Sequence, residues 1–126
     1  MRHVVSISLL ITAIIHLLPL PGVLGAARLE SLYGISMAEP NLVILMRHRA
    51  MLFGLLGAFL LVAAFRPALQ PLAIGAGLIS VIGFIWLAAM AQHNANIGRV
   101  VTADVVALVS LIAGVAAYSY TALRQS

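Results

Sequence analysis

The sequence predicts an all-α fold, in which four transmembrane helices form the bundle of a single integral membrane domain. Of its 126 residues, 63% are hydrophobic and 8% are charged, whereas a soluble domain carries about 25% charged residues. So few charges cannot cover the surface of a water-soluble globule. The predicted domain covers residues 1–126, and its four apolar stretches lie at about residues 4–20, 41–65, 72–91 and 100–121.

Each apolar stretch has roughly the length of a membrane-spanning helix, which is about 20 residues. Backbone N–H and C=O groups in lipid must be paired within the protein, and a helix pairs them within one segment. A membrane β-barrel would instead need strands of alternating polarity, and the run from Leu55 to Phe65 does not alternate. We therefore expect the four stretches to be helices.

The first stretch ends where Pro19, Pro21 and Gly22 interrupt the apolar run. A secretory signal peptide shares its leading arginine and apolar core, but we interpret the segment as a true first helix. The connector over residues 22–40 is too apolar for a solvated linker, because it contains Leu29, Leu32, Tyr33, Ile35 and Met37. We expect this connector to be ordered, in the membrane interface or against the end of the bundle.

The second stretch is expected to begin near Pro40, since proline suits the first helical turn, where its missing N–H is not needed. At its other end, Arg66, Pro67 and Pro71 bracket a very short turn. Helices joined by so short a turn pack as antiparallel neighbours. The second and third helices should therefore lie side by side.

The fourth stretch follows Asn94, Asn96 and Gly98, which indicate a loop. Small residues recur at helical spacing in the last three stretches, and transmembrane helices associate where such residues let their backbones approach. The predicted contact residues are Ala50, Gly54 and Gly57 in the second stretch, Ala73, Gly77 and Ser80 in the third, and Ala103, Ala107, Ser110, Gly114 and Ala117 in the fourth.

Polar side chains gather at one end of the predicted bundle, because the direction of the helices alternates. The opposite end has fewer polar residues, and most of these fall in turns or tails. We therefore predict a ligand-binding or polar cluster, to which no catalytic role or metal is assigned. Its members are His16, Arg47, His48, Arg49, His93, Asn94, Arg99 and Asp104.

Two arginines of this cluster fall inside the second stretch. Sixteen residues (50–65) separate Arg49 from Arg66, which is about 24 Å of helix, shorter than the roughly 30 Å hydrocarbon core. Positions 47 and 49 are about 200° apart around a helix. We expect one arginine to point into the bundle and the other to reach the lipid head groups. A reading in which both reach the head groups stays equally open.

Asp104 is the only acidic residue inside a predicted span, and an unpaired carboxylate there would be costly. We expect a structural salt bridge more than a catalytic acid. Arg99 precedes Asp104 by five residues, about 140° around the helix, which makes a direct contact awkward. Arg47 or Arg49 is therefore the expected partner.

Other site chemistries find little support in the sequence. His16, His48 and His93 could meet as metal or haem ligands, but no paired-histidine spacing occurs. We therefore predict no cofactor, with quinone and haem as the candidates considered. The absence of cysteine excludes disulfides and thiolate sites. The basic residues are scattered singly and form no stripe, so no nucleic-acid partner is expected.

Four motifs stand out along the chain: Leu32-Tyr33-Gly34, Glu39-Pro40-Asn41, Arg47-His48-Arg49 and the Gly54/Gly57 face. Together they resemble small bacterial four-helix membrane proteins of the DoxX-like and DUF4345-like groups. The similarity covers nearly the whole chain and implies a multi-pass protein of the bacterial inner membrane; some DoxX-type proteins are linked to quinone-dependent oxidation. Similar proteins also carry the name phosphopantetheine adenylyltransferase, but that soluble enzyme uses an H-x-G-H motif, which is absent here.

The leading expectation is a binding or accessory membrane protein whose polar end holds an anionic lipid or a quinone, or docks a partner subunit. Arginine suits phosphate through paired hydrogen bonds. The alternative is a small membrane enzyme acting on a lipid or quinone, with His16, His48 or His93 as the proton-transfer group. A third reading is a structural homo-oligomer in the lipid bilayer.

The orientation in the membrane depends on how the arginines are counted, because basic residues near helix ends favour the cytoplasmic side. If the two arginines within the second stretch lie inside the bundle, they drop out of the count. The termini are then expected in the cytoplasm. One side carries Arg2, Arg66 and Arg124, and the other carries Arg28, Arg47, Arg49 and Arg99.

Overall fold

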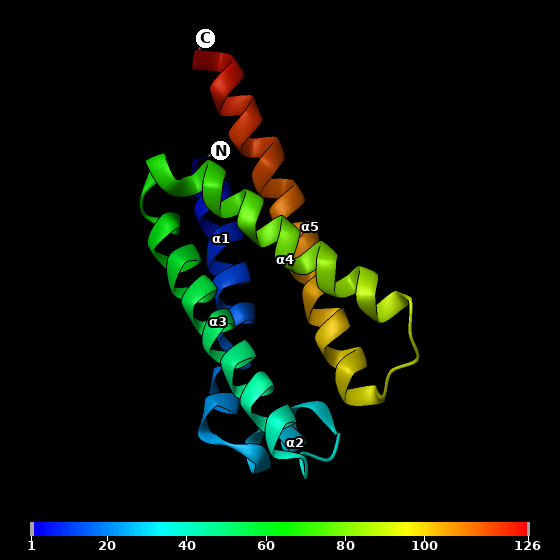
Figure 1. Cartoon of the computed structure of the whole chain (residues 1–126). Helices are drawn as coiled ribbons and strands as arrows, with labels where there is room; N and C mark the ends of the chain where they lie inside the picture. Colours follow the sequence, from blue (N-terminus) through cyan, green and yellow to red (C-terminus); the bar gives the residue numbers. More distant parts are fainter. Residues whose placement is uncertain (1, 126) are drawn as a thin grey trace.

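The computed structural model describes residues 2–125, and in this part of the chain every regular element is a helix (Figure 1). Four segments are long and apolar enough to cross a membrane, as the sequence predicts. In chain order the elements are α1 (Arg2–Leu17), the 3-10 helix η1 (Leu20–Leu24), α2 (Ala26–Tyr33), α3 (Pro40–Ala64), the 3-10 helix η2 (Pro67–Leu69), α4 (Gln70–Ala89) and α5 (Ala95–Gln125).

The other three long helices are arranged around α1, which packs against both α3 and α5. Figure 1 shows that α3 and α5 run in one direction while α1 and α4 run in the other, so α1 begins and α5 ends at the same end of the bundle. Helix α4 packs mainly on α5. Helices α3 and α5 make almost no contact with each other, which leaves space between them beside α1.

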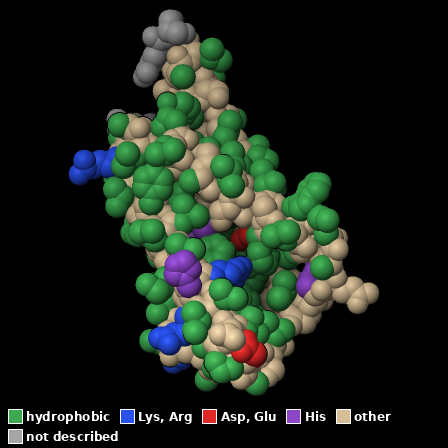
Figure 2. All heavy atoms as spheres, in the orientation of Figure 1, with side chains coloured by type: hydrophobic (Ala, Val, Ile, Leu, Met, Phe, Trp, Pro, Cys, Tyr) green, Lys and Arg blue, Asp and Glu red, His purple; other side chains and the backbone are tan. Residues whose placement is uncertain are grey.

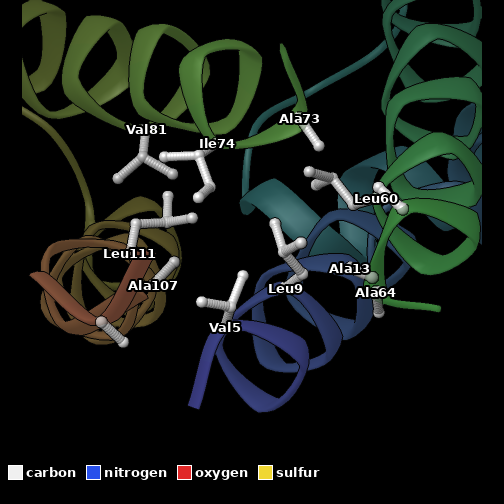
Figure 3. Close-up of a cluster of buried hydrophobic side chains, with 12 residues drawn as sticks. Val5, Leu9, Ala13, Leu60, Ala64, Ala73, Ile74, Val81, Ala107 and Leu111 are labelled. Atoms are coloured by element: carbon white, nitrogen blue, oxygen red, sulfur yellow. The ribbon is translucent and has the colours of Figure 1, made fainter. Parts of the chain in front are cut away.

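One face of α1 is buried along its whole length. Its buried residues recur every three or four positions, the spacing of a single helix face. Together with buried apolar side chains of α3, α4 and α5 they form the main core (Figure 3). The same face also carries polar groups, and the buried set is Val5, Ser8, Leu9, Thr12, Ala13 and His16.

Small residues mark the close crossings of α1 with its neighbours. A Cβ atom at Gly57 of α3 would lie 3.2 Å from the Ala13 carbonyl oxygen, and one at Gly114 of α5 would lie 2.6 Å from Ser8 Oγ. Ala107 of α5 is fully buried as well. Gly57, Ala107 and Gly114 of the predicted small-residue faces are therefore confirmed as helix contacts.

The connector between α1 and α3 is ordered against the bundle end, as predicted, and contains η1 and α2. Leu29, Tyr33 and Met37 are buried in a second small core. The Glu30 carboxylate accepts a hydrogen bond from the Met37 backbone N–H at 2.8 Å. Helix α2 ends at Gly34, which adopts a left-handed conformation with φ of 67° that favours glycine.

Helix α3 begins at Pro40, as predicted, and its start is capped. The Glu39 carboxylate accepts hydrogen bonds from the backbone N–H groups of Asn41 at 3.1 Å and Leu42 at 2.8 Å. These are free donors at a helix start, and a carboxylate there also suits the helix dipole.

Helix α5 begins at Ala95, so the prediction that Asn96 and Gly98 belong to a loop is wrong. The reason is a cap at Asn94, whose side-chain oxygen accepts a hydrogen bond from the Ile97 backbone N–H at 2.8 Å. Asparagine is among the best residues for this position. The helix therefore starts earlier than its apolar stretch.

Candidate functional site

A cavity of about 300 Å³ lies between α3 and α5, in front of α1. In Figure 2 this face of the molecule is hollowed between α3 and the α4–α5 pair, and basic, acidic and histidine side chains are visible in the hollow among hydrophobic ones. All four long helices and α2 contribute to its wall. The wall residues with polar or aromatic side chains include His16, Tyr33, Arg49, Phe53, Phe84 and Asp104.

Arg49 points into the cavity and is surrounded by aromatic rings. Its Nη1 donates a hydrogen bond to Tyr33 Oη at 2.7 Å. Its guanidinium carbon lies 4.5 Å from the centre of the Phe53 ring, 5.3 Å from that of Tyr33 and 5.6 Å from that of Phe84. Cation–π attraction of this kind strengthens where water is excluded. These rings stabilise a positive charge within a membrane span.

His16 lies at the back of the cavity with both ring nitrogens engaged. Its Nδ1 is 2.8 Å from the Thr12 carbonyl oxygen, and its Nε2 is 2.8 Å from Ser80 Oγ. A carbonyl oxygen can only accept, so Nδ1 carries the proton in the neutral ring, and Nε2 then accepts from the Ser80 hydroxyl. His16 thus ties α1 to α4.

Asp104 lies on the cavity wall, and 8% of its surface is exposed. It follows Ala95, the first residue of α5, by nine positions, about 14 Å along the helix axis. Arg49 is the charge that acts on it electrostatically. No hydrogen bond or ion pair joins its carboxylate to any other residue that the structure describes.

The predicted direct salt bridge between Asp104 and an arginine of α3 is therefore not formed. The Arg49 guanidinium is held by Tyr33 and Phe53 on its own side of the cavity. Arg47 makes a different contact, in which its Nε donates a hydrogen bond to the Val23 carbonyl oxygen at 2.8 Å. Asp104 and Arg49 therefore both face the cavity but form no salt bridge across it.

Two arginines of the predicted cluster differ in their relation to the cavity. Arg99 lines it with an exposed side chain, near the end covered by α2. Arg47 is exposed on the outer face of α3. The division between Arg49 inside and Arg47 outside agrees with the predicted 200° separation around the helix.

Two asparagines, Asn94 just before α5 and Asn96 in its first turn, position the wall of the cavity. The Asn94 Nδ2 donates to the Tyr33 carbonyl oxygen at 2.8 Å and to that of Gly34 at 3.3 Å. The Asn96 Nδ2 donates to the Ser31 carbonyl oxygen at 3.3 Å. Asn94 therefore supports Tyr33, which in turn holds Arg49.

The histidines of the predicted cluster do not meet. His48 is exposed on the outer face of α3, and His93 is exposed beyond α4, where its Nδ1 lies 3.2 Å from the Ala88 carbonyl oxygen. Within residues 2–125, no three histidine or acidic side chains are placed to hold a metal ion together. Of the three, only His16 borders the cavity.

The aromatic residues of the site were absent from the predicted cluster. Phe53 could have been found, because it follows Arg49 by four residues and so shares its helix face. Tyr33 and Phe84 come from α2 and α4, and no spacing rule relates them to Arg49. Their contribution depends on how the helices pack.

No family model, curated protein or solved structure matches the chain. The resemblance to the DoxX-like and DUF4345-like groups therefore stays a prediction. The function has to follow from the chemistry of the cavity.

Proposed function

We propose that the protein is a membrane-embedded binding or accessory protein whose cavity holds the polar head of a lipid-soluble ligand, a quinone or quinol. One observation carries the proposal. The cavity sets a hydrogen-bond donor, Arg49, against a carboxylate without a described partner, Asp104, within an otherwise mostly apolar wall. Binding sites commonly combine a few placed polar groups with an apolar lining.

Three charged residues line the cavity. Arg99 is exposed near the end covered by α2, so Arg49 and Asp104 are the charged groups inside it, and together they favour a neutral head group with both an acceptor and a donor. Arg49 can donate to a carbonyl oxygen of the ligand, and Asp104 can accept from a hydroxyl group, as a quinol provides. A phosphate would approach the Asp104 carboxylate and be repelled by it. An anionic lipid head group therefore suits this cavity less well than a quinone.

The size and position of the cavity suit a single ring. A volume of about 300 Å³ is at the lower end of small-molecule sites, so a ring fits while a long tail does not. Because the hollow lies between α3 and the α4–α5 pair (Figure 2), a tail can remain among lipid chains. The ligand would enter sideways from the bilayer.

Equilibrium binding of a short-tailed benzoquinone to the purified protein in detergent tests the proposal. A hydrogen bond to a charged group contributes about 1.5–3 kcal/mol, so Arg49→Gln should weaken binding at least about tenfold, and Asp104→Asn should weaken binding of the quinol form. Arg66→Gln, an exposed arginine beyond the other end of α3, is the control. Unchanged affinity in both cavity variants, with helical content retained, would refute the proposal.

A small membrane enzyme acting on a lipid or quinone is the second candidate. It is favoured by the presence of two groups able to exchange protons, His16 and Asp104, on the wall of one cavity. The His16→Gln variant distinguishes the two candidate functions. An enzyme should keep its affinity for the quinone and lose turnover with an added electron donor, whereas a binding protein should show no turnover before or after the change.

We further propose the bacterial inner membrane as the location, with both termini on the same side of it. An even number of candidate spans and the shared end of α1 and α5 (Figure 1) support termini on one side. With Arg49 inside the bundle, basic residues no longer favour either side, because each end keeps three arginines. They are Arg28, Arg47 and Arg99 at the cavity end and Arg2, Arg66 and Arg124 at the other. Labelling of tagged termini decides which side they occupy.

A further inference from the structure

A second hollow lies on the outer face of the bundle, where η1 and the end of α1 pack against α3. This groove has a volume of about 910 Å³ and is open on one side. Its wall is apolar except for His48. Several wall side chains are well exposed, with 73% of Leu24, 55% of Met51 and 69% of Leu55 accessible.

Basic groups stand at one end of this groove. His48 lines the groove directly. Arg47 lies beside the groove, because its Nε donates a hydrogen bond at 2.8 Å to the carbonyl oxygen of Val23, which is a wall residue. The two terminal amino groups of Arg47 have no partner among the residues that the structure describes. No acidic side chain lines the groove, in contrast to the cavity with its Asp104.

The depth of these groups in a membrane suits a phosphate. Arg47 precedes Ala64, the last residue of α3, by 17 positions, or about 26 Å of helix. If the end of α3 marks one surface of a roughly 30 Å hydrocarbon core, Arg47 and His48 lie about 4–6 Å inside the opposite surface, from where the long Arg47 side chain reaches the head groups. Met51 and Leu55 then continue from them toward the membrane centre.

We propose that this groove binds one anionic phospholipid, with its phosphate on Arg47 and His48 and an acyl chain along Met51 and Leu55. Arginine recognises phosphate through its planar set of donors, and a histidine ring adds a further donor. The apolar wall takes the chain. The site is independent of the quinone proposal, because the two hollows lie on different sides of α3 and differ in charge.

Native mass spectrometry of the purified full chain tests this site, with phosphatidylglycerol and phosphatidylcholine of identical acyl chains as probes. We expect a single phosphatidylglycerol to be retained about fivefold more tightly than phosphatidylcholine, because both lipids carry the phosphate but the choline group adds a positive charge that Arg47 repels. Arg47→Gln combined with His48→Gln should remove this preference. Arg66→Gln, at the opposite end, should leave it intact.

Three results would overturn the proposal. Equal retention of the two lipids by the unchanged protein would mean non-selective lipid contact. An equal loss in the Arg66→Gln control would mean that net charge alone attracts the lipid. Retention of glycerol phosphate as strong as that of the whole lipid would mean that the groove takes no acyl chain. The first and third measurements use the unchanged protein, so they hold even where a variant fails to fold.

Discussion

Replacing Gly57 by alanine probes the crossing on which the cavity rests. The added Cβ would lie 2.8 Å and 2.9 Å from Leu17 side-chain carbons and 3.2 Å from the Ala13 carbonyl oxygen. The Leu17 side chain can rotate away, but the backbone oxygen of Ala13 moves only if α1 moves. Helix α1 must therefore shift by a few tenths of an ångström from α3.

Overpacking of this kind costs about 1–3 kcal/mol, and the better helix propensity of alanine offsets up to about 1 kcal/mol. We expect a net loss of about 1–2 kcal/mol in the free energy of unfolding. His16 lies one turn beyond Ala13 and bonds to Ser80 at 2.8 Å, so the same shift should weaken quinone binding.

Gly75→Ala is the matched control, because a Cβ at this position in α4 meets no atom within 4 Å. This variant should be unchanged or more stable by up to about 1 kcal/mol. Unfolding in mixed detergent micelles, followed by circular dichroism, measures both. If Gly57→Ala were as stable as Gly75→Ala, α1 and α3 would not cross as closely as the structure indicates.

Three further predictions follow from the site and the fold. Tyr33→Phe removes the phenol oxygen that holds Arg49 at 2.7 Å and should weaken quinone binding several-fold without a large loss of helix; unchanged binding would mean that Tyr33 does not orient the guanidinium. Asn94→Ala should cost about 1 kcal/mol as a lost helix cap and raise hydrogen exchange over residues 31–34, whereas the exposed neighbour Gln92→Ala should not. Tags on the two termini should be labelled from the same side of the membrane; labelling from opposite sides would exclude four spans.

Much of this fold follows from spacing along single helices. The length of the apolar stretches predicts the four spans, and the helical period predicts that Arg47 and Arg49 diverge. Small residues such as Gly57 and Gly114 locate the contacts of α1 because close backbone approach requires them. Each of these properties depends on a single helix, so it can be predicted from the sequence without knowing how the helices pack.

The rest depends on how helices are placed relative to one another. The salt bridge expected at Asp104 assumed that α3 and α5 touch, but α1 lies against both and they stay apart. The aromatic surround of Arg49 likewise joins α2, α3 and α4. The early start of α5 is different, since Asn94 is a recognisable helix cap that hydropathy alone does not detect.

Photolabelling with a short-tailed azidoquinone tests most directly whether the cavity holds a quinone. The purified protein is illuminated with the probe, and labelled peptides are identified by mass spectrometry. We predict labels on the cavity wall, at Phe53, Phe84 or within residues 31–33 and 96–104, that disappear when unlabelled quinone is added in excess. Labels confined to the outer groove at residues 20–24, or labels that unlabelled quinone does not displace, would contradict a quinone site between α3 and α5.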